Sequence, residues 1–267
     1  MKYRLIAADM DGTLLNEEAE LTTRTKTALI KAVEAGILFV TATGRPMVAA
    51  EKVNAIFEKD MPFITFNGAV IIMGKSRKTL MNKHLDFALA KEGYTIGASQ
   101  NIPVIIWTGE QLWVSRECKE VSDYQEASSA KLSVIDEIDD LSERSVSKML
   151  WIGSPEKISC LQNEMKTHFE GKLNCFTSLP IFLEFVSIEA DKGTALAEIG
   201  RIYGIDRSEM IAVGDGYNDI SMIKYAGLGV AMANAPKDVK AASGFVTLSN
   251  NDDGVAAVIE KYIIRNS

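Results

Sequence analysis

Paired acidic residues follow short apolar stretches at two places far apart in the sequence. Asp9 and Asp11 come after one such stretch, and Asp215 and Asp219 come after another. Taken alone, each pair is also typical of a turn or of a helix start, where Asp is common. Carboxylates that converge repel one another unless a cation lies among them, and oxygen ligands without His or Cys suit Mg²⁺. The sequence therefore predicts a magnesium site, provided that the fold brings the two pairs together.

Two further groups of residues favour an anion beside such a site. Lys192 opens an expected helix, where the helix dipole disfavours a cation by about 0.3–1 kcal/mol. Thr43 and Gly44 follow another apolar stretch, and a hydroxyl with a backbone amide at a helix start binds phosphate readily. A solvated lysine and a simple helix cap explain these residues equally well when each is considered alone. Beside the carboxylates, they indicate a site that handles phosphate.

The elements around these residues alternate strand and helix at both ends of the chain. Strands and helices follow one another with short connections, which is typical of a parallel sheet covered on both faces. In such sheets, ligands bind beyond the carboxyl ends of the strands. The fold class expected is therefore α/β, with a Rossmann-like parallel-sheet core. Its strands are predicted at 5–8, 37–40, 63–66, 210–213, 228–232 and 245–248, and its helices at about 23–35, 47–57 and 194–203.

The middle of the chain follows a different pattern. Residues 81–187 mix helices, near 87–94 and 158–169, with short meandering strands, which favours an α+β unit. We therefore expect a core formed by residues 1–80 and 188–267, with residues 81–187 inserted into it. Both parts are of a viable domain size.

The polar clusters together resemble the four motifs of the haloacid dehalogenase superfamily. Asp9–Thr13 resembles motif I in its phosphatase form, Thr43–Arg45 motif II, Lys192–Gly193 motif III and Gly214–Asp219 motif IV. Their order and spacing, together with Asn67–Ala69, resemble the Cof-type subfamily. In that subfamily a type IIB α/β cap is inserted between motifs II and III, which implies a catalytic core and a cap domain here.

The resemblance also implies roles for individual residues. Asp9 would be the nucleophile that forms an aspartyl-phosphate, and Asp11 would be the general acid and base. Mg²⁺ would be held by a carboxylate oxygen of Asp9, the backbone carbonyl of Asp11 and the side chain of Asp215, with Asp219 supporting these ligands. The residues that would bind the phosphate or the substrate are Met10, Thr43, Gly44, Lys192 and Asn218.

Composition narrows the classes of protein that remain. The 267 residues include 29 Lys+Arg and 36 Asp+Glu, a net charge of −7, which argues against a nucleic-acid partner. The 3 cysteines lack CxxC spacing and predict reduced thiols rather than a zinc site or a disulfide framework. The apolar runs are too short to span a membrane, and the start of the chain lacks the core of a signal peptide. We expect a cytoplasmic protein without a membrane partner.

The function expected is Mg²⁺-dependent hydrolysis of small phosphorylated metabolites, most plausibly sugar phosphates, through an aspartyl-phosphate. Two alternatives stay open: a sugar phosphomutase on the same scaffold, and a non-catalytic protein that binds a phosphorylated metabolite. The sequence identifies neither the substrate nor the cap residues that select it, nor the oligomeric state. It also leaves open the roles of Glu184, His84 and His168.

Overall fold

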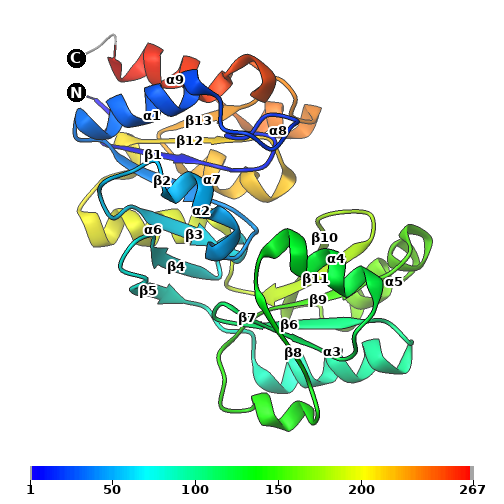
Figure 1. Cartoon of the computed structure of the whole chain (residues 1–267). Helices are drawn as coiled ribbons and strands as arrows, with labels where there is room; N and C mark the ends of the chain where they lie inside the picture. Colours follow the sequence, from blue (N-terminus) through cyan, green and yellow to red (C-terminus); the bar gives the residue numbers. More distant parts are fainter. Residues whose placement is uncertain (1, 265–267) are drawn as a thin grey trace. The chain divides into compact units, whose positions relative to one another are not determined.

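The computed structural model describes residues 2–264, in which the chain divides into two compact units (Figure 1). The first, called here the core unit, contains the chain up to Gly44, Ala50–Leu80 and the chain from Asp191 onward. The second, called the inserted unit, contains Arg45–Ala49 and Met81–Ala190. The short segment Arg45–Ala49 therefore groups with the insert, although it lies far from the insert in sequence.

The described residues of the core unit build on a sheet of eight strands in the order β14-β13-β12-β1-β2-β3-β4-β5. The strands from β14 to β3 run parallel, and β4 pairs with β3 antiparallel. The parallel α/β core predicted from the sequence is confirmed. The strands are β1 Leu5–Ala8, β2 Leu38–Ala42, β3 Pro62–Thr65, β4 Val70–Met73, β5 Thr79–Asn82, β12 Met210–Gly214, β13 Leu228–Ala231 and β14 Phe245–Val246.

Helices cover both faces of this sheet (Figure 1). Helices α1 and α9 pack together on one face, and α6 and α7 pack together on the other. Helix α6 begins where the side chain of Asp191 accepts the backbone N–H groups of Gly193 and Thr194, and it ends at Gly204, which has a φ of 62°. The helices are α1 Thr23–Glu34, α2 Glu51–Asn54, α6 Lys192–Tyr203, α7 Ile220–Tyr225, α8 Lys237–Ala242 and α9 Gly254–Tyr262.

Two elements are shorter than their sequence patterns predict. The helix expected at 47–57 is a 3₁₀ turn, Met47–Ala50, followed by the short α2. Helix α2 stops at Asn54, whose side-chain amide donates to the carbonyl of Gly74 at 3.1 Å and thereby ties this end to the β4–β5 turn. The strand expected at 245–248 is hydrogen-bonded as a strand only over Phe245–Val246.

The inserted unit has its own sheet and its own hydrophobic core. Its described strands follow the order β10-β11-β9-β6-β7-β8. Helices α3 and α5 cover one face, where Met149, Trp151 and Phe185 form part of the core. Residues on α4 cover the other face, where the Trp107 indole N–H donates to the Tyr124 hydroxyl at 3.1 Å. The elements are α3 Phe87–Ser99, β6 Val104–Thr108, β7 Gln111–Val114, α4 Lys119–Ser128, β8 Lys131–Val134, β9 Val146–Ile152, α5 Pro155–His168, β10 Leu173–Thr177 and β11 Phe182–Ser187.

An ion pair is buried beside Tyr124 in the inserted unit. Lys148 Nζ lies 3.2 Å from Glu184 Oε2, and the two residues are 2% and 5% exposed. The hydroxyl of Ser178 donates to the other carboxylate oxygen at 2.6 Å. Burial lowers the pKa of Lys148, but the charge of Glu184 and the Tyr124 hydroxyl outweigh burial and raise that pKa above its usual value. Glu184 is thus held by partners of its own unit, on strand β11, whose four central residues are all buried.

Breaking this pair should destabilise the inserted unit strongly. The Glu184→Leu variant leaves the Lys148 ammonium buried without its partner, which costs about 3–5 kcal/mol of the free energy of unfolding. Replacing both residues, as Lys148→Met with Glu184→Leu, should recover most of that loss. Tryptophan fluorescence in a urea titration measures this unit selectively, because all 3 tryptophans of the chain lie in it: Trp107, Trp113 and Trp151. Equal destabilisation of the single and double variants would contradict the prediction.

The cysteines and the two histidines lie outside the polar clusters predicted from the sequence. Cys118, Cys160 and Cys175 are free thiols in the structure. His84 contacts the Ser145 hydroxyl, and His168 contacts Glu92, both in exposed positions on the inserted unit. Among the described residues, no helix combines the length and the apolar character needed to cross a membrane.

Candidate active site

The strand ends that carry polar residues meet at one edge of the core sheet. Strand β1 lies between β12 and β2, and Ala8 pairs with Val213 on one side and with Thr41 on the other. Asp9 is the next residue after β1, and Asp215 is the next residue after β12. Because neighbouring parallel strands end at the same edge, the two acidic pairs and the residues that follow β2 converge there.

Lys192 lies between two carboxylates at this edge. Its Nζ is 2.6 Å from Asp9 Oδ1 and 2.6 Å from Asp219 Oδ1, and the lysine is fully buried. Burial lowers the pKa of Lys192, but the charges of Asp219 and Asp9 outweigh burial and raise that pKa above its usual value. The ammonium is therefore charged at neutral pH. The two carboxylates explain why a cation is tolerated in the first turn of α6.

Asp219 is fixed by donors on both of its carboxylate oxygens. One oxygen accepts from Lys192, and the other accepts the backbone N–H groups of Asp215 at 3.0 Å and Gly216 at 2.8 Å. A Cβ at Gly214 would lie 2.5 Å from the Asp219 side chain, so the close approach needs glycine at that position. Asp219 thus holds the turn after β12 in place and positions Lys192.

Asp9 and Asp215 carry the excess negative charge of the cluster. Burial raises the pKa of Asp9 well above its usual value, the charge of Asp219 adds to this, and Lys192 only partly opposes it. Burial also raises the pKa of Asp215 to about 6. The hydrogen bond from the Thr13 hydroxyl, at 2.8 Å from Asp215 Oδ1, lowers this pKa but does not outweigh burial. Carboxylate oxygens of Asp9, Asp215 and Asp219 lie within 4.8 Å of one another. The three carboxylates outnumber the single ammonium of Lys192, and their ligand atoms are all oxygens. Such a group suits a hard cation such as Mg²⁺.

The raised pKa of Asp215 predicts how the stability of the metal-free protein depends on pH. Between the usual value near 3.8 and about 6, the folded state keeps a proton that the unfolded state has lost. Stability in EDTA should therefore rise as the pH falls from 7.5 to 5, by on the order of 1–3 kcal/mol from this group. The Asp215→Asn variant lacks the titrating group and should be the more stable protein at pH 7.5 in EDTA.

Scanning calorimetry of both proteins at several pH values measures this effect. The difference in stability between Asp215→Asn and the wild type should shrink as the pH falls toward 5. Added Mg²⁺ at pH 7.5 should raise the melting temperature of the wild type and leave that of the variant unchanged. A difference that does not vary with pH would contradict the raised pKa.

The residues predicted to bind phosphate lie at the neighbouring strand ends. The buried Thr43 donates its backbone N–H to the carbonyl of Ile64 at 2.8 Å and accepts the backbone N–H of Asn67 at 3.1 Å. A Cβ at Gly44 would lie 3.0 Å from the Asn67 amide, so the two residues are in close contact. Asn218 donates its side-chain amide to Asn67 Oδ1 at 2.9 Å. Asn67 thereby links the ends of β2, β3 and β12.

The turn after β1 separates its two aspartates. Asp9 is 6% exposed, whereas Asp11 lies at the surface. The carbonyl of Met10, whose side chain is buried, accepts the backbone N–H groups that begin the next turn. Gly12 has a φ of 74°, and a Cβ there would lie 2.5 Å from the Asp215 carboxylate, so this turn requires glycine. Two carboxylates only two residues apart therefore occupy different environments.

Sequence reasoning gave no separate role to three residues of this site. Thr13 contacts Asp215, Asn67 links three strand ends, and Asn234 donates its amide to the carbonyl of Gly12 at 2.8 Å. Asn234 follows β13, at the same sheet edge as the predicted clusters. The rule that strand ends carry the site could therefore have identified it.

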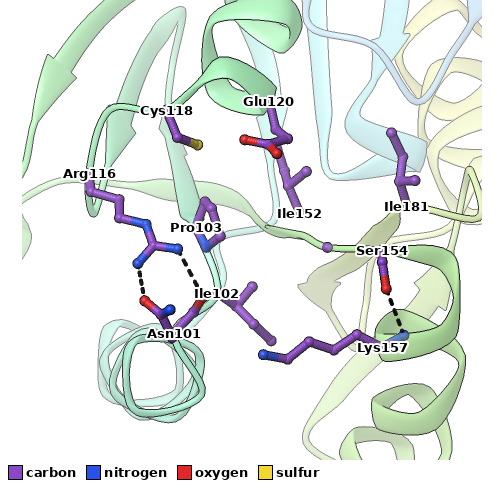
Figure 2. A pocket seen from close by; sticks show the side chains of 11 residues that line it. Asn101, Ile102, Pro103, Arg116, Cys118, Glu120, Ile152, Ser154, Lys157 and Ile181 are labelled. Atoms are coloured by element: carbon purple, nitrogen blue, oxygen red, sulfur yellow. Dashed lines mark hydrogen bonds between the residues drawn. The ribbon is translucent and has the colours of Figure 1, made fainter.

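A cavity of about 470 Å³ lies elsewhere, in the inserted unit (Figure 2). Its basic side chains already have protein partners. Arg116 donates to the backbone carbonyl of Asn101 at 2.9 Å, as Figure 2 shows, and Lys157 Nζ donates to the carbonyl of Gln100 at 2.5 Å. Its lining residues all belong to the inserted unit, so the cavity is distinct from the acidic cluster of the core unit.

Comparison with known proteins identifies the family. The sequence of this chain matches the family model of the haloacid dehalogenase-like hydrolases over residues 6–259. The chain belongs to the haloacid dehalogenase-like hydrolases. The superfamily predicted from the four motifs is thus confirmed. Of its relatives, the Bacillus subtilis protein YwtE, named as a 5-amino-6-(5-phospho-D-ribitylamino)uracil phosphatase, is 31% identical over 291 residues, covering 97% of this chain and 98% of the relative.

Solved structures of similar proteins agree with this assignment. A haloacid dehalogenase-like hydrolase from Bacteroides thetaiotaomicron is 32% identical, with a TM-score of 0.89 over 97% of this chain and 99% of that one. A Thermotoga maritima protein is 30% identical, with a TM-score of 0.87 over 97% of both chains. Because relatives such as YwtE are named as phosphatases, this haloacid dehalogenase-like hydrolase is an enzyme of the phosphatase type.

Proposed function

We propose that this phosphatase hydrolyses phosphate monoesters of small metabolites, above all phosphorylated sugars and polyols, with Mg²⁺ and with Asp9 as nucleophile. The observation that carries the proposal is the contact of a buried lysine with Asp9 and Asp219, beside Asp215. The name of YwtE, which describes a phosphorylated ribityl compound as its substrate, supports the substrate class.

The core unit offers a suitable donor set for one divalent cation. Carboxylate oxygens of Asp9 and Asp215 and the backbone carbonyl of Asp11 would hold it, while Asp219 keeps the turn and Lys192 in place. Bound Mg²⁺ supplies positive charge that neutralises the oxygens of the transferring phosphoryl group. All of these ligands are oxygens, in agreement with the preference of Mg²⁺.

The first step transfers the phosphoryl group to the enzyme. A carboxylate oxygen of Asp9 attacks phosphorus, and the bond between phosphorus and the ester oxygen breaks. The leaving alkoxide takes a proton from the carboxyl group of Asp11. Lys192 orients Asp9 through the hydrogen bond at 2.6 Å. Its positive charge also offsets the negative charge of Asp9, which would otherwise repel the incoming anionic substrate.

Donors around the strand ends would hold the phosphoryl oxygens during this step. Backbone contacts join the ends of β2 and β3 and fix the hydroxyl and amide groups located there. These donors therefore need little rearrangement to stabilise charge as it develops on the phosphoryl group. The proposed donors are the hydroxyl of Thr43, the backbone N–H groups of Met10 and Gly44, the ammonium of Lys192 and the amide of Asn218.

The second step returns the enzyme to its starting state. Asp11, now a carboxylate, takes a proton from a water molecule, and the water oxygen attacks phosphorus. The bond between phosphorus and Asp9 breaks, which releases inorganic phosphate and regenerates the carboxylate of Asp9. Asp11 is again protonated, so the cycle closes without another reactant.

We also propose that the insert, residues 81–187, selects among phosphate esters as a cap domain. The chemistry proposed for the core unit involves only the phosphoryl group, which all such substrates share. Discrimination between sugars must therefore come from groups outside the acidic cluster.

A screen of phosphorylated metabolites tests the proposed function. Purified protein with Mg²⁺ should release inorganic phosphate from sugar and polyol phosphates, with 5-amino-6-(5-phospho-D-ribitylamino)uracil included in the panel. EDTA should abolish the release and added Mg²⁺ should restore it. Full activity in metal-free protein would contradict the metal requirement, whereas an isomerised sugar phosphate formed without phosphate release would indicate a mutase.

A further inference from the structure

Asn234 contacts the two loops that would carry metal ligands. Its amide nitrogen donates to the backbone carbonyl of Gly12 at 2.8 Å and lies 3.4 Å from Asp215 Oδ2. Thr13 donates to the other oxygen of the same carboxylate at 2.8 Å. Both carboxylate oxygens of Asp215 therefore have a donor. Thr13 is part of the turn after β1, and Asn234 is hydrogen-bonded to that turn through Gly12.

The orientation of the Asn234 amide is set by a third bond. Its Oδ1 accepts the backbone N–H of Asn250 at 3.1 Å, so the nitrogen must face Gly12 and Asp215. Asn250 is itself anchored, because its side-chain amide donates to the carbonyl of Leu15 at 2.9 Å. The amide of this exposed residue is thus oriented by contacts within the protein alone.

These contacts constrain two positions that a cation would use. One is the carboxylate of Asp215. The other is the backbone carbonyl of Asp11, which lies one peptide before the Gly12 carbonyl that Asn234 holds. Residues that hydrogen-bond to metal ligands without contacting the metal orient those ligands. Removing such a residue commonly lowers metal affinity or activity by about 10–100-fold.

We infer that Asn234 is a positioning residue for the Mg²⁺ site, which holds Asp215 and the turn carrying Asp11 in the arrangement that receives the cation. The inference rests on the proposed function, because it presupposes a metal at Asp9 and Asp215. Asn234 itself is assigned neither as a ligand nor as a contact of the substrate.

Direct binding of Mn²⁺ tests the inference without measuring turnover. Electron paramagnetic resonance counts free Mn²⁺ in a titration of metal-free protein, and competition with Mg²⁺ shows that both ions share the site. The Asn234→Leu variant should bind Mn²⁺ about 10–100-fold more weakly than the wild type. The Asn234→Ala variant, which removes the same donor with a smaller side chain, should show a similar loss if the first variant folds poorly.

A matched control separates positioning from general support of the loop. Asn251 is a neighbouring exposed asparagine whose Oδ1 accepts the backbone N–H of Glu17 at 3.0 Å, a bond that involves neither Gly12 nor Asp215. The Asn251→Ala variant should keep the wild-type affinity for Mn²⁺. An equal loss of affinity in both asparagine variants would overturn the inference.

The remaining outcomes distinguish the inference from the proposed function. Wild-type affinity in the Asn234 variants would overturn the positioning role and leave the metal site standing. A wild type that binds no Mn²⁺, or an Asp215→Asn variant that binds it normally, would overturn the proposed metal site itself. Turnover of the Asn234→Leu variant should approach the wild-type rate only at raised Mg²⁺ concentration.

Discussion

The Asp9→Asn variant should lose hydrolysis of every phosphate monoester, by on the order of 10⁴–10⁶-fold, the range seen when members of a covalent catalytic unit are removed. An amide at this position has no carboxylate oxygen to attack phosphorus, and it removes one proposed metal ligand. No phosphoryl-enzyme can then form with any leaving group. Good and poor leaving groups should therefore suffer alike.

The fold should survive this substitution. Burial raises the pKa of Asp9, which means that its charge is unfavourable in the metal-free folded protein. A neutral amide should therefore leave the melting temperature in EDTA equal to or above that of the wild type, as is common where function requires a strained site. Asp206→Asn is the matched control, because Asp206 only caps the turn before β12, at the opposite end of that strand. Turnover near the wild-type rate in Asp9→Asn would refute the assigned nucleophile.

The placement of the site was predictable from the sequence because it follows from topology. Apolar runs before Asp9 and Asp215 predict strands, and parallel strands deliver their last residues to one edge. Lys192 was predictable for a different reason, since the helix dipole disfavours a cation in the first turn of a helix, and acidic neighbours can compensate for this. The structure gives it two, each at 2.6 Å.

Other features depend on pairings that a sequence does not display. Lys148 and Glu184 meet because β9 and β11 pair in one register, and a shift by one residue would place them on opposite faces. Asn234 reaches Gly12 only through the order β13-β12-β1. Asn54, the last residue of the short helix α2, bonds to Gly74, on a turn that follows β4. None of these contacts is visible in the sequence, because the partners are distant in the chain.

Asp11 should have a smaller and more selective effect than Asp9. The Asp11→Asn variant keeps the nucleophile and the backbone carbonyl that would bind the metal, but it loses the proton donor. Since general acid and base assistance contributes about 10²–10⁴-fold, turnover of an ordinary sugar phosphate should fall by that amount. The surface position of Asp11, in contrast to the buried Asp9, suits a group that exchanges protons with the leaving group and with water.

The leaving group separates the two proton transfers assigned to Asp11. p-Nitrophenyl phosphate needs little protonation, so the Asp11→Asn variant should still transfer its phosphoryl group to Asp9. Hydrolysis of the aspartyl-phosphate should then stall, because no base activates the water, and nitrophenol should appear as a burst of about one equivalent per enzyme. Mass spectrometry of the protein quenched during turnover should find phosphate on Asp9 in this variant and none in Asp9→Asn. Equal slowing of the sugar phosphate and of p-nitrophenyl phosphate in the transfer step, with no phosphate on Asp9, would exclude Asp11 as the proton shuttle.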